Sequence, residues 1–129
     1  ATHYRYTTLG DTRIYWLAEN LRTEDHSIAQ LAVERGHCQA EKIRIHPYRN
    51  TLTRHAGQGL KYLPDWESKA VSNNECLLIC SDGFWSQLDD KDIFRIKDNT
   101  DLTLLLDQMM TTQLTDNLSV VLLRSASAT

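Results

Sequence analysis

Apolar residues are concentrated in short stretches of the chain, and polar breaks separate these stretches. β-Branched and aromatic residues at positions 3–9 and 13–17 flank a Gly-Asp break. This pattern predicts two strands, or a strand with a bulge and its hairpin partner. Residues 76–80 are continuously apolar, as is typical of a strand buried on both faces. Residues 118–124 predict a final strand.

Helical signals lie between these strands. Ser27 is suited to cap a helix over residues 28–35, and Gly36 suits the left-handed position that follows a helix. A shorter helix is expected over residues 39–45, ending before Pro47. These signals place helices beside the strands of one mixed fold.

Two further helices are predicted between the last two apolar strands. Asp89 or Asp90 is suited to cap a helix that runs to residue 96. Asp101 is predicted to cap a stronger helix over residues 102–112, where apolar residues recur at helical spacing.

The composition is that of one folded globular domain: the chain has 129 residues, of which 41% are hydrophobic and 24% charged. We expect residues 1–124 to form this domain and residues 125–129 to be a tail. Cys76 and Cys80 would lie about 13 Å apart on one strand, too far for a disulfide. Reduced thiols and a cytoplasmic location are therefore expected.

The charge and the apolar runs exclude two kinds of partner. A net charge of −3 and a pI near 5.9, with Lys and Arg scattered along the chain, argue against a nucleic-acid partner. The apolar runs are far shorter than the roughly 20 residues that cross a bilayer, so this portion is expected to be soluble. The first residues show no signal-peptide core and no initiator Met, which is expected of an excised or proteolysed piece.

Two aspartates stand beside the most apolar strands: Asp82 follows residues 77–80, and Asp116 precedes residues 118–123. If these strands are antiparallel neighbours, both carboxylates meet at one end of the sheet. Their repulsion would then favour a hard divalent cation such as Mg²⁺ or Mn²⁺. The alternative is that Asp82-Gly83 and Asp116-Asn117 are ordinary turns.

Several separated segments resemble known sequence motifs. Residues 10–13 resemble Gly-Asp-Ser-Arg, and residues 23–27 resemble Thr-x-Asp-His. Residues 81–85 resemble a Ser-Asp-Gly-Leu-Trp signature, and residues 116–120 a closing Asp-Asn-x-Thr/Ser-Val. In this order, the motifs resemble those of the metal-dependent type 2C family of Ser/Thr protein phosphatases. Residues 46–54 with Gly57 resemble the stretch that, in bacterial members, leads into the flap, a loop near the active site.

The resemblance implies an α+β fold, a β-sandwich of two antiparallel sheets flanked by helices. It implies hydrolysis of phosphoserine and phosphothreonine by a metal-activated water, with two Mn²⁺ or Mg²⁺ ions. By motif match, Asp82 and Asp116 are metal ligands, and Asp11 helps to hold a weaker third ion. The alternative for Asp11 is a turn carboxylate that pairs with Arg13.

Other residues are given supporting roles. Ser81 and Asn117 are expected to orient the metal-binding carboxylates. His26 is interpreted as structural rather than as a general acid. Arg49 and Arg54, in a predicted surface loop over residues 48–64, could attract phosphate near the flap, or could belong to a solvated basic loop. The tryptophans are interpreted as packing residues: Trp16, Trp66 and Trp85.

The sequence departs from the family in one respect, because the motifs of the family's first half are missing. No Asp-Gly-His occurs, so the bridging carboxylate and the expected general acid are absent from this chain. We therefore expect the C-terminal half of a phosphatase domain, inactive alone, whose partners are a phosphorylated protein and the missing half-domain or a second copy. Exposed strand edges should result.

Two alternatives stay open. One is a non-catalytic phosphatase-like module that binds a phosphoprotein or a kinase. The other, supported only by the exposed strand edges, is an oligomerisation domain.

Overall fold

The computed structural model describes residues 2–59, 64–112 and 116–125. Residues 126–129 of the expected tail at 125–129, and residues 60–63 of the predicted loop, lie outside this part of the chain. In the described part, no helix is both long and apolar enough to cross a membrane. The strands are β1 (His3–Tyr6), β2 (Arg13–Trp16), β3 (Leu21–Arg22), β4 (Glu67–Ala70), β5 (Cys76–Cys80) and β6 (Val120–Arg124).

Four of the strands form an antiparallel sheet in the order β3-β2-β5-β6. The central strand β5 pairs with β2 on one side and with β6 on the other, so Cys80 lies opposite both Arg13 and Val120. This position explains its continuous apolar sequence. Leu78 and Cys80 face one core cluster and Leu77 another, as predicted for a strand buried on both faces.

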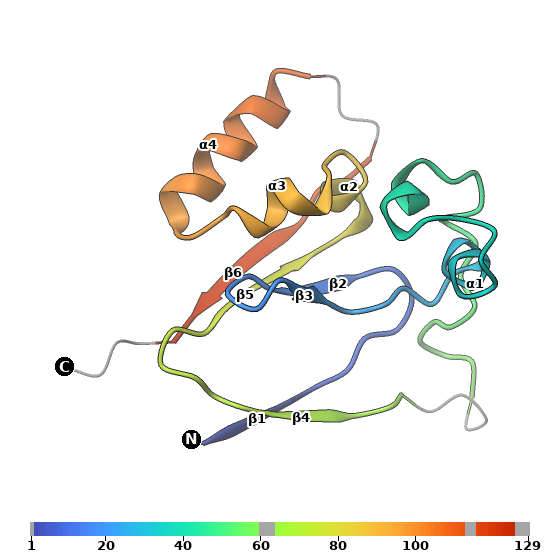
Figure 1. Cartoon of the computed structure of the whole chain (residues 1–129), viewed down its shortest axis with the longest axis horizontal. Coiled ribbons are helices and arrows are strands. Elements are labelled where there is room, and N and C mark those ends of the chain that lie inside the picture. The colour runs from blue at the N-terminus through green and yellow to red at the C-terminus, as the bar shows by residue number, and fades with distance from the viewer. Residues whose placement is uncertain (1, 60–63, 113–115, 126–129) are drawn as a thin grey trace.

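The helices are α1 (Ile28–Glu34), the 3₁₀ helix η1 (Ala40–Ile45), α2 (Asp82–Trp85), α3 (Asp90–Phe94) and α4 (Asn99–Met110). Figure 1 shows α2, α3 and α4 on one face of the four-stranded sheet. In the same view, α1 and η1 lie at the end of the sheet where β5 leads into α2.

The second sheet is the antiparallel pair β1-β4, on the opposite side of the four-stranded sheet (Figure 1). The two strands predicted at the start of the chain are present, but the hairpin alternative is wrong. Both edges of β2 are already paired, with β3 and β5. The tyrosines of β1 instead pack against Trp16 of β2. The Tyr6 and Trp16 rings meet edge-on with their centroids 4.9 Å apart, and the Trp16 indole N–H donates to the Tyr4 hydroxyl at 2.8 Å.

The helix predictions were correct in part. Ser27 caps α1, its side chain accepting from Gln30 N, and Asp89 precedes α3. The prediction that Asp101 caps the last helix is wrong, because the cap is Asp98, which accepts from the Asp101 backbone N–H at 2.9 Å. The Asp101 carboxylate accepts from Lys97 N at 2.9 Å, so each of the two aspartates satisfies a backbone N–H next to the start of α4.

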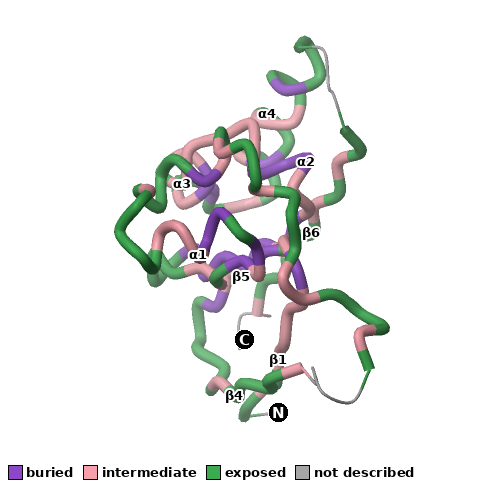
Figure 2. The backbone as a smooth tube through the Cα atoms, turned by 90° about the vertical axis from the view of Figure 1, so that its right-hand side faces the viewer, coloured by how far each residue is buried: buried purple, intermediate pink, exposed green. Residues whose placement is uncertain are grey.

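The buried residues follow this layering (Figure 2). The larger core cluster lies between the four-stranded sheet and the helices, around Tyr15, Phe84 and Trp85, and the smaller one lies toward β1. The edge strand β6 is less well covered, with Val121 and Leu123 still 52% and 49% exposed. An apolar strand surface is therefore exposed, as the sequence predicts for half of a sandwich.

Candidate active site

The two strand-end aspartate segments lie side by side, because β5 and β6 are antiparallel neighbours. Beyond the last strand pair, Ser81 N donates to the Ser119 carbonyl and Ser119 N donates to Ser81 Oγ, both at 3.0 Å. The expected adjacency of the segments that carry Asp82 and Asp116 is therefore confirmed. The Ser81 hydroxyl joins the two strand ends, and its expected support of a carboxylate stays a prediction.

Asp82-Gly83 opens the short helix α2 and is not an isolated turn. The α2 backbone packs directly on the segment before β6: a Cβ placed on Gly83 would lie 1.9 Å from the Asn117 carbonyl oxygen. A side chain at position 83 would therefore push the two segments apart. Glycine is required here by close approach rather than by an unusual backbone angle.

Asp116 lies at the exposed rim of this arrangement. Its Oδ1 accepts a hydrogen bond from the backbone N–H of Asn117 at 2.7 Å. Asn117 thus contacts the carboxylate through its main chain. Asp82 is only partly exposed, with 22% of its side-chain surface accessible.

Asp11 lies in the loop between β1 and β2, where Gly10 adopts a positive φ of 92°. Burial raises the pKa of the Asp11 carboxyl, and the nearby negative charges of Asp82 and Asp25 raise it further. The structure therefore brings Asp11 within electrostatic reach of Asp82. The carbonyl of Asp11 accepts a 2.8 Å hydrogen bond from the indole of Trp85.

The alternative that Asp11 pairs with Arg13 is wrong, because two nitrogens of the Arg13 guanidinium donate hydrogen bonds to the buried carboxylate of Asp25. The two bonds, from Nε and Nη2, measure 2.8 and 2.6 Å. Burial favours the neutral form of Arg13, but the hydrogen bonds and charge of Asp25, with Tyr15, outweigh it and raise the Arg13 pKa. The guanidinium also stacks on the Trp85 ring, 3.5 Å from its centroid.

The two arginines of the predicted loop have different surroundings. Arg49 reaches the site: its Nη1 lies 3.7 Å from Asp82 Oδ2, and its guanidinium is 5.9 Å from the centroid of the Trp85 ring. Arg54 pairs with Asp65 at 3.1 Å. Of the two, Arg49 is therefore the arginine that the structure places beside the aspartates.

His26 is built into the loop framework. Its ring Nδ1 accepts a hydrogen bond from Gly10 N at 3.1 Å. Its backbone N–H donates to the Gly10 carbonyl at 2.7 Å, and its backbone carbonyl accepts from Thr53 N. Burial, assisted by the positive charge of Arg54, lowers its pKa. These contacts favour the interpretation of His26 as a structural residue.

Two residues of the site had no predicted role there. Trp85 is fully buried, as expected for a packing residue, yet its indole N–H reaches the Asp11 loop. Asp25 lies in the segment 23–27 that resembles Thr-x-Asp-His, and the sequence analysis assigned it no function. A signal for Asp25 was available, because an Arg inside a predicted strand needs a carboxylate partner when buried.

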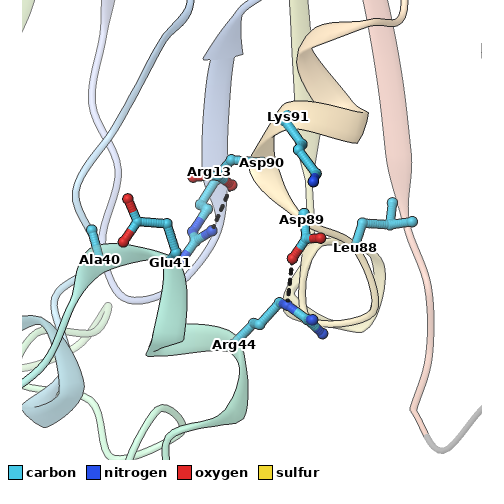
Figure 3. Close-up of a pocket in the computed structure, with 8 residues that line it drawn as sticks. All are labelled: Arg13, Ala40, Glu41, Arg44, Leu88, Asp89, Asp90 and Lys91. Atoms are coloured by element: carbon cyan, nitrogen blue, oxygen red, sulfur yellow. Dashed lines mark hydrogen bonds and ion pairs between the residues drawn. The ribbon is translucent and has the colours of Figure 1, made fainter.

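A separate pocket of about 260 Å³ lies between η1 and the start of α3 (Figure 3). Arg44 contacts Asp89 there at 3.1 Å, and Arg13 lies 3.6 Å from Asp90. Its charged side chains thus pair largely with one another. None of the predicted metal ligands lines this pocket.

In fold, the chain is similar to solved structures of bacterial serine/threonine phosphatases. It superposes on phosphatase Stp1 from Staphylococcus aureus with a TM-score of 0.76 and 24% identity, covering 98% of this chain and 53% of that one. For PstP/Ppp of Mycobacterium tuberculosis the TM-score is 0.77 at 22% identity, over 95% and 55% of the two chains. The predicted fold of antiparallel sheets flanked by helices is confirmed.

Sequence comparison identifies the same class. The chain is 31% identical over 94 residues to a type 2C protein phosphatase of Streptococcus pyogenes, which covers 70% of this chain and 38% of that protein. It is 28% identical over 91 residues to protein phosphatase PhpP of Streptococcus pneumoniae, covering 68% and 37%. No protein-family model matches. The resemblance to type 2C phosphatases is confirmed, and the chain spans less than two fifths of these relatives.

Proposed function

We propose that this chain supplies part of the active site of a metal-dependent serine/threonine protein phosphatase. The observation that carries the proposal is the convergence of three segments at one end of the four-stranded sheet. These are the loop with Asp11, the start of α2 with Asp82, and the segment with Asp116 that leads into β6. The phosphatases of similar sequence and fold support it.

The donor set fits a hard divalent cation. Carboxylate oxygens suit Mn²⁺ and Mg²⁺, and Mg²⁺ is commonly held by one or two carboxylates together with water. Across residues 2–59, 64–112 and 116–125, no three His, Cys, Asp or Glu side chains form a ready metal-binding group. Water and a complementary half-domain would therefore complete the coordination. A structure of the PstP catalytic domain contains two manganese ions, and this chain superposes on it with a TM-score of 0.74.

Each residue has a defined task in this proposal. Asp82 and Asp116 hold two Mn²⁺ or Mg²⁺ ions, and Asp11 helps to hold a weaker third. When bound, such ions supply an activated water for attack on phosphorus and offset the charge of the phosphoryl oxygens. Arg49, held only loosely at 3.7 Å from Asp82, attracts the phosphate of the substrate.

The partner in this proposal is a protein phosphorylated on serine or threonine. The chain alone is inactive, because it contains no Asp-Gly-His to provide the bridging carboxylate and general acid of the family. The missing half-domain, or a second copy that covers the exposed edge, completes the fold.

The test is Mn²⁺-dependent hydrolysis of a phosphothreonine peptide by this chain joined to its upstream half-domain. We expect Asp82→Ala to lower kcat/KM by more than about 100-fold, and the 129-residue chain alone to be inactive. The control is Asp107→Ala, which removes an exposed carboxylate on α4 and should change little. An inactive longer protein that still binds the phosphopeptide would support the non-catalytic module instead.

A further inference from the structure

Trp85 connects two of the three segments that form the candidate site. It is the last residue of α2, whose first residue is Asp82. Its side chain is fully buried, and its indole N–H donates to the Asp11 carbonyl at 2.8 Å. A rigid side chain therefore joins the helix of one carboxylate to the loop of the other.

The indole ring is itself held from its face. The Arg13 guanidinium stacks at 3.5 Å from the ring centroid, and Asp25 fixes that guanidinium through two hydrogen bonds. Arg13 and Asp25 are 2% and 4% exposed, so solvent does not compete with this contact. The ring has little freedom to turn, and the direction of its N–H is fixed.

The opposite side of α2 is fixed as well, where Gly83 packs against the Asn117 backbone. α2 is thus held between the segment before β6 and the loop before β2. A shift of the Trp85 indole would change how far Asp11 lies from Asp82. It would leave the pairing of β5 with β6 in place.

We propose that Trp85 is a positioning residue, whose indole N–H holds the Asp11 loop beside Asp82, so that the Asp11 carboxylate can help to hold the weaker third cation there. This inference rests on the proposed metal-binding function. It assigns Trp85 a task beyond core packing and beyond satisfying its own buried N–H.

The variant that tests it is Trp85→Phe, which keeps an aromatic ring for Arg13 and removes the N–H. We expect the Kd of its weakest Mn²⁺ site, measured by calorimetry on this chain joined to its upstream half-domain, to rise about 10-fold. The matched control is Trp16→Phe, which removes another buried indole hydrogen bond of 2.8 Å, to Tyr4 on the other side of the sheet. It should lose similar stability in urea without weakening Mn²⁺ binding.

A measurement on the wild-type protein of the same length, with the upstream half-domain, avoids any loss of folding. In a Mg²⁺ titration followed by NMR, the indole N–H signal of Trp85 should shift, and those of Trp16 and Trp66 should not. The positioning role alone is overturned if both Phe variants weaken Mn²⁺ binding equally. It is also overturned if the Trp85 signal does not move although Asp82→Asn abolishes binding. No binding by the wild type, or binding unaffected by Asp82→Asn, overturns the proposed metal site and this inference with it.

Discussion

Gly83 and Arg13 are the residues at which the site depends most directly on close packing. Gly83 permits the contact between α2 and the Asn117 backbone, and Arg13 fills the space between Asp25 and Trp85. Neither residue touches the candidate cation position in the proposal. Each nonetheless decides where an aspartate lies.

Replacing Gly83 by alanine should therefore be unusually costly. The added Cβ meets a backbone carbonyl at 1.9 Å, which no side-chain rotation can relieve, so we expect a loss of at least about 3 kcal/mol in urea unfolding. Gly36→Ala is the control: its φ is 76° but no atom lies within 4 Å of the new Cβ, so only about 1 kcal/mol should be lost. Equal losses for the two variants would contradict the clash.

Only some of these residue contacts could be predicted from the sequence. The approach of the Asp82 and Asp116 segments followed from two apolar strands being antiparallel neighbours. The bond from Asp25 to Arg13 did not follow, because the sequence left Arg13 with a local partner, Asp11, and the true partner reaches it only through the tertiary fold.

At the scale of elements, the sequence signals succeeded where a stretch carried its own pattern. β5 was predicted by its apolar run and α1 by its cap. α2 was missed because a helix of four residues has no period of its own, and packing at Gly83 and Trp85 fixes it. β4 was missed because its Glu-Ser-Lys-Ala sequence is mostly exposed, and pairing with β1 defines it.

The true cap of α4 provides a test at this scale. Asp98→Ala removes the acceptor for Asp101 N, so we expect a loss of about 1 kcal/mol in the free energy of unfolding measured in urea. Asp107→Ala, on the exposed face of the same helix, should stay within about 0.5 kcal/mol of the wild type. If Asp98→Ala were equally neutral, the capping assignment would be wrong.

At the scale of the whole molecule, the layers are covered unevenly. α3 and α4 lie over one face of the four-stranded sheet, whereas the small β1-β4 sheet lies beneath the other (Figure 1). An open apolar hollow of about 350 Å³ lies there, lined in part by Tyr6, Leu77 and Leu123. β6 is also an edge strand, so its outer backbone groups have no partner strand in the described sheet.

An apolar edge strand of this kind pairs readily with other chains. We therefore expect the isolated 129-residue chain to self-associate through β6, with a sedimentation coefficient that rises with concentration. Val121→Lys should abolish this rise, because a lysine on the edge would have to be buried unpaired in the contact between copies. Leu104→Lys is the matched control, since Leu104 is 58% exposed on α4, away from this edge.

Concentration dependence that persists in Val121→Lys but disappears in Leu104→Lys would move the contact to α4. A wild-type chain that stays monomeric at every concentration would mean that the β1-β4 sheet covers enough of the sandwich face by itself. The first outcome would separate self-association from the strand edge. The second would mean that a complementary half-domain has less apolar surface to cover than the exposure of Val121 and Leu123 indicates.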